Sequence, residues 1–160
     1  MDRTVVKDVL RYYAAIPGMR KVLREELEVL EDEYNSLHGV ASDGMPHGST
    51  PGRGAEARGI QAAENNVSLH ISQRRQKDAE LLADYSAIGG CLDRLNGGYK
   101  RVLILRFVRG YSWGRISVQM KTPDSTVRYW CDHALDRLKE PLYRLPDSGG
   151  IISRAWDART

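Results

Sequence analysis

The feature that most constrains the fold is a pair of long apolar patterns with alternating steps of three and four residues. The first pattern runs through Met19, Leu23, Leu27, Leu30, Tyr34 and Leu37. The second begins near residue 57 and runs through Ile60, Val67, Ile71, Leu81, Tyr85, Ile88, Leu92 and Leu95. This spacing predicts two long, coiled-coil-like helices, each of which buries a narrow apolar stripe against a partner helix. We call the two sets of residues together the apolar seam.

The partner of this seam lies either within the chain or in a second copy. A 20-residue helix is roughly 30 Å long, whereas residues 57–88 as one helix span roughly 48 Å. An intrachain hairpin therefore leaves part of the longer helix uncovered. Either the first short helix of the chain covers this part or a second subunit does, and we favour a homo-oligomer, first of all a dimer. Its contacts are predicted at Leu23, Leu27, Leu30, Tyr34, Leu37, Val67, Ile71, Leu81 and Tyr85. Glu64, Arg74 and Asp78 occupy seam positions, where polar residues fix register or mark the point at which a seam leaves its partner.

Interruptions of the periodicity divide the chain into five predicted segments. These are N-terminal helices (1–38), a flexible Gly/Pro-rich loop (39–56), a long helix with a bend near 89–90 (57–96), a helix-turn-helix module (97–145) and a tail (146–160). Pro17-Gly18 is expected to interrupt or kink the first helix, because proline disfavours the helical conformation of the residue before it. The tail is amphipathic through Ile151, Ile152 and Trp156, yet as a terminal segment it is expected to fray.

The net charge of +3 conceals an uneven distribution. Residues 1–40 carry 6 basic and 8 acidic side chains, and residues 41–98 carry 6 and 7. Residues 99–160 carry 12 basic and 6 acidic side chains, so the whole positive surplus lies in the last third of the chain. Such asymmetry indicates a surface that faces a polyanion, although a solvated basic face would have the same composition.

Other classes of protein are disfavoured by what the sequence lacks. No apolar run approaches 18 residues and the N-terminus has no secretory signal, so we expect an intracellular protein. Two cysteines make no disulfide framework, and Cys91 and Cys131 are interpreted as small core residues. Asp43, Met45 and His47, with His38, lack metal-ligand spacing. We expect no metal, no cofactor and no membrane or small-molecule partner, and no catalytic constellation indicates an enzyme.

The segment after Asn96-Gly97-Gly98 is typical of a helix-turn-helix. Residues 99–108 form one predicted helix, with Gly110 as its C-terminal glycine and Ser112 as the N-cap of the next short helix. A third helix is predicted to start with Thr122 as N-cap, Pro123 in the first helical position and Asp124 in the first turn. Its apolar face comprises Val127, Trp130, Cys131, Ala134, Leu135 and Leu138.

In a helix-turn-helix, the outward side chains at the start of the second helix of the motif read base edges. These are Asp124, Ser125, Arg128 and Tyr129, of which Arg128 best matches the two acceptors of guanine. The predicted DNA-backbone contacts are Lys100, Arg101, Arg109, Ser112, Arg115, Lys121 and Thr122. The opposing interpretation is a purely structural trihelical unit, since the same helix also carries Asp132, Asp136 and Glu140.

Residues 99–138 resemble region 4 of bacterial sigma factors, which binds promoter DNA. Ser112 matches the capping hydroxyl, Ile116 the buried aliphatic residue and Val127-Arg128 the apolar-basic pair, while residues 134–138 (ALDRL) match the ending of that region. The resemblance implies an all-α fold with base-reading positions at Asp124, Ser125 and Arg128. Asp and Ser stand where primary sigma factors carry longer side chains, which implies a different target sequence.

As a whole, the chain is similar to phage and prophage late-gene transcriptional regulators of the RinA and ArpU type. The resemblance rests on the Ser112-Trp113 step and on the order of helical region, loop and sigma-like module. It implies a DNA-binding regulator of late, packaging or lysis genes that acts with host RNA polymerase, in the cytoplasm of a bacterial host cell and associated with the nucleoid. Two alternatives stay open: a DNA-packaging protein resembling a small terminase subunit, and a sigma-like adaptor that binds polymerase without DNA.

Overall fold

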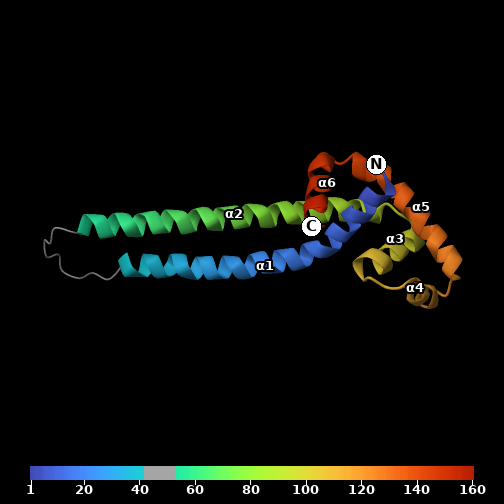
Figure 1. The fold of residues 1–160 in the computed structure, drawn as a ribbon, viewed down its shortest axis with the longest axis horizontal. Coiled ribbons are helices and arrows are strands. Elements are labelled where there is room, and N and C mark those ends of the chain that lie inside the picture. Colours follow the sequence, from blue (N-terminus) through green and yellow to red (C-terminus); the bar gives the residue numbers. More distant parts are fainter. Residues whose placement is uncertain (42–52) are drawn as a thin grey trace. The chain divides into compact units, whose positions relative to one another are not determined.

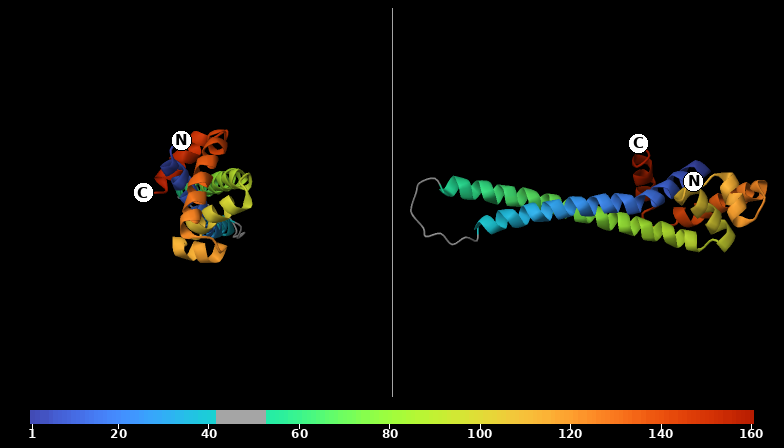
Figure 2. Two further views of the ribbon diagram at one scale, coloured as in Figure 1. Left: turned by 90° about the vertical axis from the view of Figure 1, so that its right-hand side faces the viewer. Right: turned by 90° about the horizontal axis from the view of Figure 1, so that it is seen from below.

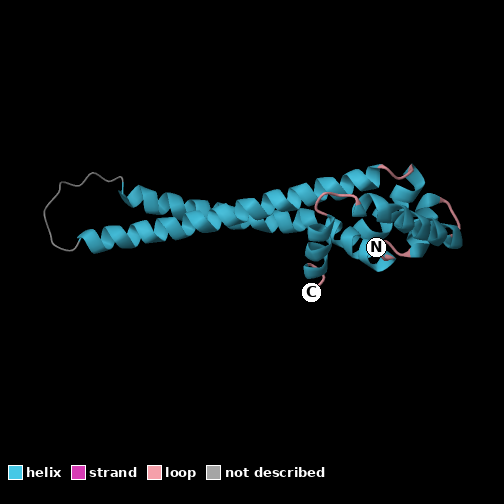
Figure 3. Cartoon of the chain, turned by 90° about the horizontal axis from the view of Figure 1, so that it is seen from above, coloured by secondary structure: helices cyan, strands magenta, loops and turns pink. Residues whose placement is uncertain are grey.

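The computed structural model describes the backbone of residues 1–41 and 53–160, and the side chains of residues 1–37 and 54–160. All regular structure in these residues is helical (Figure 3), as the sequence predicts. The elements, labelled in Figure 1 except for the π-helical turn η1, are α1 (Arg3–Ala41), α2 (Arg53–Asp93), α3 (Gly97–Leu103), η1 (Ile104–Val108), α4 (Trp113–Met120), α5 (Asp124–Tyr143) and α6 (Ser148–Asp157). The loop predicted over residues 39–56 lies mostly outside the described residues.

The chain divides into two compact units. The hairpin unit is Gly18–Glu80, and the helix-turn-helix unit combines Met1–Pro17 with Leu81–Thr160. The division falls at the Pro17-Gly18 pair, but α1 continues through both residues without interruption. Of the two outcomes expected at this pair, an interruption of the helix is therefore not observed. One proline removes a single intrahelical hydrogen bond, and a helix of 39 residues retains its other backbone hydrogen bonds on both sides.

Within the hairpin unit, α1 and α2 run antiparallel and side by side (Figure 1). The seam residues Val67 and Ile71 of α2 are buried there, whereas Leu23, Leu27 and Leu30 of α1 are only half-buried. The intrachain hairpin thus covers the α2 side of this part of the seam more completely than the α1 side.

Ion pairs connect the two helices of the hairpin unit. Arg20 Nε lies 2.8 Å from Asp78 Oδ1, and Arg74 Nε lies 2.7 Å from Glu26 Oε2. The Arg20 hydrogen bond holds the pKa of the Asp78 carboxyl below its usual range. Arg74 and Asp78 thus each pair with a residue of the opposite helix, as expected of polar seam residues that fix register.

In the helix-turn-helix unit, α3 to α6 gather around the first turns of α1 and the last turns of α2 (Figure 2). Helix α5 packs on α3 and α4. The core consists of aliphatic side chains from every element, among them Leu10, Ile16, Leu81, Leu92, Leu103, Ile116, Leu135, Leu138 and Ile151. Cys91 and Cys131 belong to this core, as predicted, and burial raises the pKa of both thiols, that of Cys131 to about 11.

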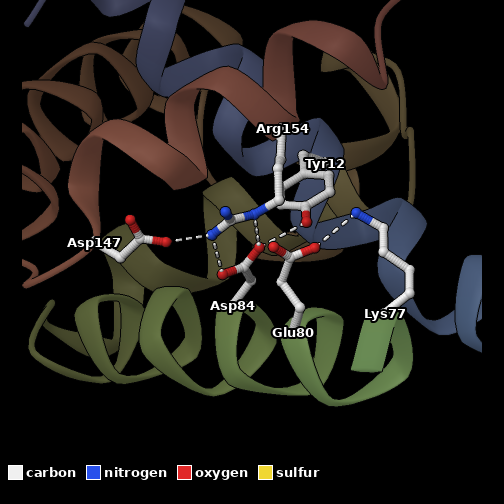
Figure 4. A network of polar contacts seen from close by, with 6 residues as sticks. All are labelled: Tyr12, Lys77, Glu80, Asp84, Asp147 and Arg154. Atoms are coloured by element: carbon white, nitrogen blue, oxygen red, sulfur yellow. Dashed lines mark hydrogen bonds and ion pairs between the residues drawn. The ribbon is translucent and has the colours of Figure 1, made fainter. Parts of the chain in front are cut away.

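The tail forms helix α6 instead of fraying. Ile151 and Ala155 are buried, while Trp156 is exposed. Figure 4 shows the polar contact that holds α6: Arg154 donates from Nε and Nη2 to the two carboxylate oxygens of Asp84, at 2.7 and 2.8 Å. Tyr12 donates its hydroxyl to the same carboxylate at 2.7 Å, and Arg154 Nη2 also reaches Asp147 at 2.6 Å. The buried Asp84 thereby ties α1, α2 and α6 together.

Candidate nucleic-acid interface

The first helix of the helix-turn-helix module begins and ends at identifiable caps. Asn96 Oδ1 accepts the Tyr99 backbone N–H at 3.1 Å, so α3 begins at Gly97, two residues before the predicted start. The helix continues as the π-helical turn η1, which ends at Val108. Gly110, two residues later, has a φ of +67°, the left-handed conformation expected of a C-terminal glycine. The Tyr111 N–H donates to the Leu105 carbonyl at 2.9 Å, which closes this end.

The tight turn of the motif comprises Lys121, Thr122 and Pro123. Ser112 Oγ accepts the Arg115 N–H at 3.3 Å, which confirms Ser112 as the N-cap of α4. Lys121 ends α4 in the left-handed conformation, with φ 51°. Thr122 is not the N-cap of α5, because its hydroxyl donates back to the Met120 carbonyl at 3.0 Å and Pro123 occupies the cap position.

Helix α5 presents one buried and one exposed face. Val127, Cys131, Ala134, Leu135 and Leu138 are buried, as the apolar pattern predicts, and Trp130 is partly buried. Ser125, Arg128 and Tyr129 are exposed, and Asp124 is partly exposed. A helix packed in this way against α3 and α4 leaves its first two turns free to enter the major groove.

The geometry of Arg128 is defined by two neighbours. Its Nε donates to Asp124 Oδ2 at 2.9 Å, one turn earlier on α5, and its guanidinium lies 5.4 Å from the ring centroid of Trp113. Arg106 approaches the same ring at 4.6 Å. Trp113 therefore holds two guanidinium groups beside the start of α5 through cation–π contacts.

The acidic residues in the middle and last turns of α5 form ion pairs with cations. Asp132 lies 3.5 Å from Arg3, and Asp136 lies 2.5 Å from Arg3 and 2.7 Å from Lys139. Glu140 pairs with Arg144 in the last turns of the helix. The hydrogen bonds from Arg3 and Lys139 hold the pKa of the Asp136 carboxyl well below its usual range. Each of these carboxylates is therefore already compensated by a cation.

The cations predicted to contact the DNA backbone are largely without such compensation. Of the set, Lys100 pairs with Asp93 at 2.5 Å. No ion pair within the described residues involves the remaining four, which are Arg101, Arg109, Arg115 and Lys121. The guanidinium of Arg115 lies 3.7 Å from the Tyr111 ring centroid. Uncompensated positive charge is therefore exposed on α3 and α4 and at the residues directly after η1 and α4.

Three of these predicted contacts come together. Lys100, Arg101 and Arg109 line one cavity of about 340 Å³ with Gln119 of α4.

The hydroxyl oxygen of Ser112 and the hydroxyl proton of Thr122 are engaged in the backbone contacts described above. Sequence reasoning missed Arg106 and the part played by Trp113, although an aromatic residue directly after the Ser112 N-cap was the available signal.

The described residues contain no group of three or more His, Cys, Asp or Glu side chains that could hold a metal ion. The loop residues weighed as metal ligands, Asp43, Met45 and His47, lie outside that part of the chain, as does the side chain of His38. Among the helices described, none combines the length and apolarity needed to cross a membrane.

Comparison with known proteins matches part of the chain to a family model. No curated protein and no solved structure matches the chain. The family model described as sigma-70, region 4 matches residues 85–138, from the last turns of α2 to within α5. This segment contains the whole helix-turn-helix motif, including Ser112, the turn at Lys121 and Arg128. The chain therefore carries a sigma-70 region 4-like helix-turn-helix at residues 85–138, which indicates a DNA-binding function connected with transcription.

Proposed function

We propose that this protein is a sequence-specific, double-stranded DNA-binding regulator of transcription that acts with host RNA polymerase. Its targets would be late, packaging or lysis genes of a phage or prophage, as the similarity to RinA- and ArpU-type regulators implies. The observation that carries the proposal is the exposed start of α5, with Arg128 on its surface, flanked by the uncompensated cations of α3 and α4. The protein acts by binding, without catalysis, in the bacterial cytoplasm.

In the proposed complex, the first turns of α5 lie in the major groove. Arg128 exchanges its bond with Asp124 for the N7 and O6 acceptors of a guanine, and Asp124 becomes free to accept from a cytosine N4 amino group. Ser125 and Tyr129 face the adjacent base edges. Arg101, Arg109, Arg115 and Lys121 contact phosphates and release counterions, which gives most of the affinity.

A footprint together with a transcription assay tests this proposal. The purified protein is incubated with DNA from the phage or prophage that encodes it, and protected sites are mapped. Protection upstream of a promoter, with a protein-dependent change in run-off transcription by host polymerase, is the expected result. Protection confined to a packaging site would favour the small-terminase-like alternative. Binding to polymerase with no salt-dependent binding to DNA would favour the adaptor.

We also propose a homodimer formed through the hairpin unit. The half-buried residues Leu23, Leu27 and Leu30 support it, because their remaining apolar surface is available to a second copy. Sedimentation equilibrium gives a dimer mass if the proposal holds, and Leu27→Glu lowers it to that of a monomer. A monomer mass for the unmodified protein at all concentrations would refute the dimer.

A further inference from the structure

A second basic cavity lies in the helix-turn-helix unit, on the side of α5 that faces the N-terminal turns of α1. It has a volume of about 520 Å³. Its charged lining consists of Lys7 and Arg11 from α1, Arg106 from η1 and Asp132 from α5, and Trp113 forms part of its wall. Neither α1 residue belongs to the segment that matches sigma-70 region 4.

The charges in this cavity do not balance. Asp132 is the one carboxylate of the lining and is shared with Arg3 at 3.5 Å. Arg11 is paired with Asp8 at 3.1 Å but keeps a largely exposed guanidinium. Arg106 uses one N–H on the Tyr111 carbonyl, at 2.9 Å. Lys7 takes part in no ion pair within the described part of the chain, so its ammonium adds positive charge to this cavity without compensation.

The cavity adjoins the base-reading turn of α5. Asp132 follows Arg128 by one helical turn, and Arg128 lies over the Trp113 ring that helps to line the cavity. A helix in the major groove, which is about 12 Å wide, has a phosphate strand on each side. A cationic cavity one helical turn from Arg128 is therefore placed where such a strand would pass.

We propose that this cavity binds a phosphate group of the DNA backbone, so that Lys7 and Arg11 extend the DNA interface from the sigma-like module onto α1. The proposal rests on the proposed DNA-binding function. It adds a DNA contact beside the base-reading residues of α5. This contact comes from α1, which lies outside the segment that matches sigma-70 region 4. Lys7 is the principal phosphate ligand, because its ammonium group does not have to break an ion pair with a carboxylate before it binds the phosphate.

The test compares the salt dependence of DNA binding by the full chain and its Lys7→Gln variant. Each phosphate contact contributes about −0.9 to the slope of log K against log salt. We expect Lys7→Gln to reduce the magnitude of this slope by about that amount and to weaken binding about tenfold at 0.1 M salt. The loss is the same on selected and random duplexes, since a phosphate contact carries no sequence information.

Lys21→Gln is the matched control. It removes a lysine from the same helix, at an exposed position in the hairpin unit, and we expect no change in slope. Thermal unfolding of both variants verifies that they fold. Arg11→Gln provides a second test and should reduce the slope less than Lys7→Gln, because Arg11 is already paired with Asp8.

Three results would overturn the assignment. One is an unchanged slope for Lys7→Gln when the unmodified protein binds DNA. Another is a loss confined to the selected sequence. The third is binding of a small anion only, seen as stabilisation of the unmodified protein by pyrophosphate that Lys7→Gln abolishes without affecting DNA binding. If the unmodified protein binds no DNA at all, the proposed DNA-binding function fails together with this assignment. In the three results above, the unmodified protein still binds its ligand, so they contradict only the assignment of the cavity.

Discussion

Arg128 donates to the carboxylate of Asp124 at 2.9 Å, so the arginine best suited to read a guanine begins in an ion pair with its neighbour on the same face of α5. Both side chains are about half exposed. An exposed pair of this kind contributes about 0–1 kcal/mol, whereas a bidentate arginine–guanine contact provides about 1–3 kcal/mol of discrimination. Exchange of Asp124 for a guanine is therefore favourable, and the ion pair holds Arg128 in place until DNA arrives.

Arg128→Ala should weaken binding to the selected DNA site by about 1–3 kcal/mol and relax discrimination at one base pair. The physical reason is the loss of two hydrogen bonds to a base edge with little change elsewhere. Arg144→Ala is the control, because Arg144 makes the same type of exposed pair with Glu140 in the last turns of α5. Titrations of labelled duplexes with each base pair substituted measure both effects. An equal loss on selected and random DNA would show that Arg128 contacts phosphate instead of a base.

Asp124→Asn should raise the affinity for random DNA and lower the ratio of specific to random binding. The substitution removes a negative charge from the surface that approaches the phosphates, and it replaces one of the two carboxylate oxygens that can accept from cytosine by an amino group that donates. Parallel titrations on selected and random duplexes at one salt concentration give both quantities. A loss of affinity on random DNA would mean that Asp124 acts mainly by positioning Arg128.

The sequence predicted much of the fold because apolar periodicity and capping residues act locally. The seam positions gave the long helices, Gly110 and Ser112 marked helix ends correctly, and the buried face of α5 was identified almost in full. Thr122 was misassigned because its hydroxyl donates to a carbonyl at the end of α4 and does not cap α5. The choice between two neighbouring cap positions depends on the turn geometry.

What the sequence could not predict are contacts between residues far apart in the chain. Nothing local indicates that Arg154 in the tail meets Asp84, and this contact orders a segment that was expected to fray. In the same way, Arg3 compensates Asp132 and Asp136 from the other end of the chain. The acidic residues of α5 therefore argue against DNA binding when the sequence alone is considered, but they do not once their ion pairs in the structure are known.

Arg154→Met should destabilise the helix-turn-helix unit by about 3–5 kcal/mol, because it leaves the buried Asp84 carboxylate without its cation. Urea unfolding followed by tryptophan fluorescence measures this, since all three tryptophans lie in that unit. Arg159→Met is the control, with an expected change of about 0–1 kcal/mol, because Arg159 is exposed and Asp8 keeps Arg11. Equal effects of the two substitutions would contradict the structural role of Arg154.

The stability of the helix-turn-helix unit should fall as the pH drops below about 4. The pKa of Asp136 is lower in the folded protein than its unfolded value of 3.8, so its stabilising contribution is present above that value and is lost as the pH falls through the folded pKa. Asp136→Asn should make the decline below about pH 4 shallower. Asp157→Asn, which removes an exposed carboxylate in α6, should leave the decline unchanged. Identical pH profiles for Asp136→Asn and the unmodified protein would refute this coupling.

Both thiols should resist modification in the folded protein. Burial raises the pKa of Cys131 to about 11 and also raises that of Cys91, so the reactive thiolate is scarce at pH 8 and the sulfur atoms are inaccessible. A disulfide reagent at pH 8 should titrate two thiols per chain only after unfolding. Rapid reaction of either thiol before unfolding would show that the core around α5 or the end of α2 opens readily.

The most direct test of the central claim is selection of duplexes from a random library by the purified protein, followed by affinity measurements over a range of salt concentrations. A reader of base edges should enrich one sequence motif and bind it at least about 10³-fold more tightly than random DNA, with affinity that falls steeply as salt rises. Enrichment of no motif, together with equal binding of every duplex or with no salt-dependent binding, would contradict sequence-specific recognition by α5.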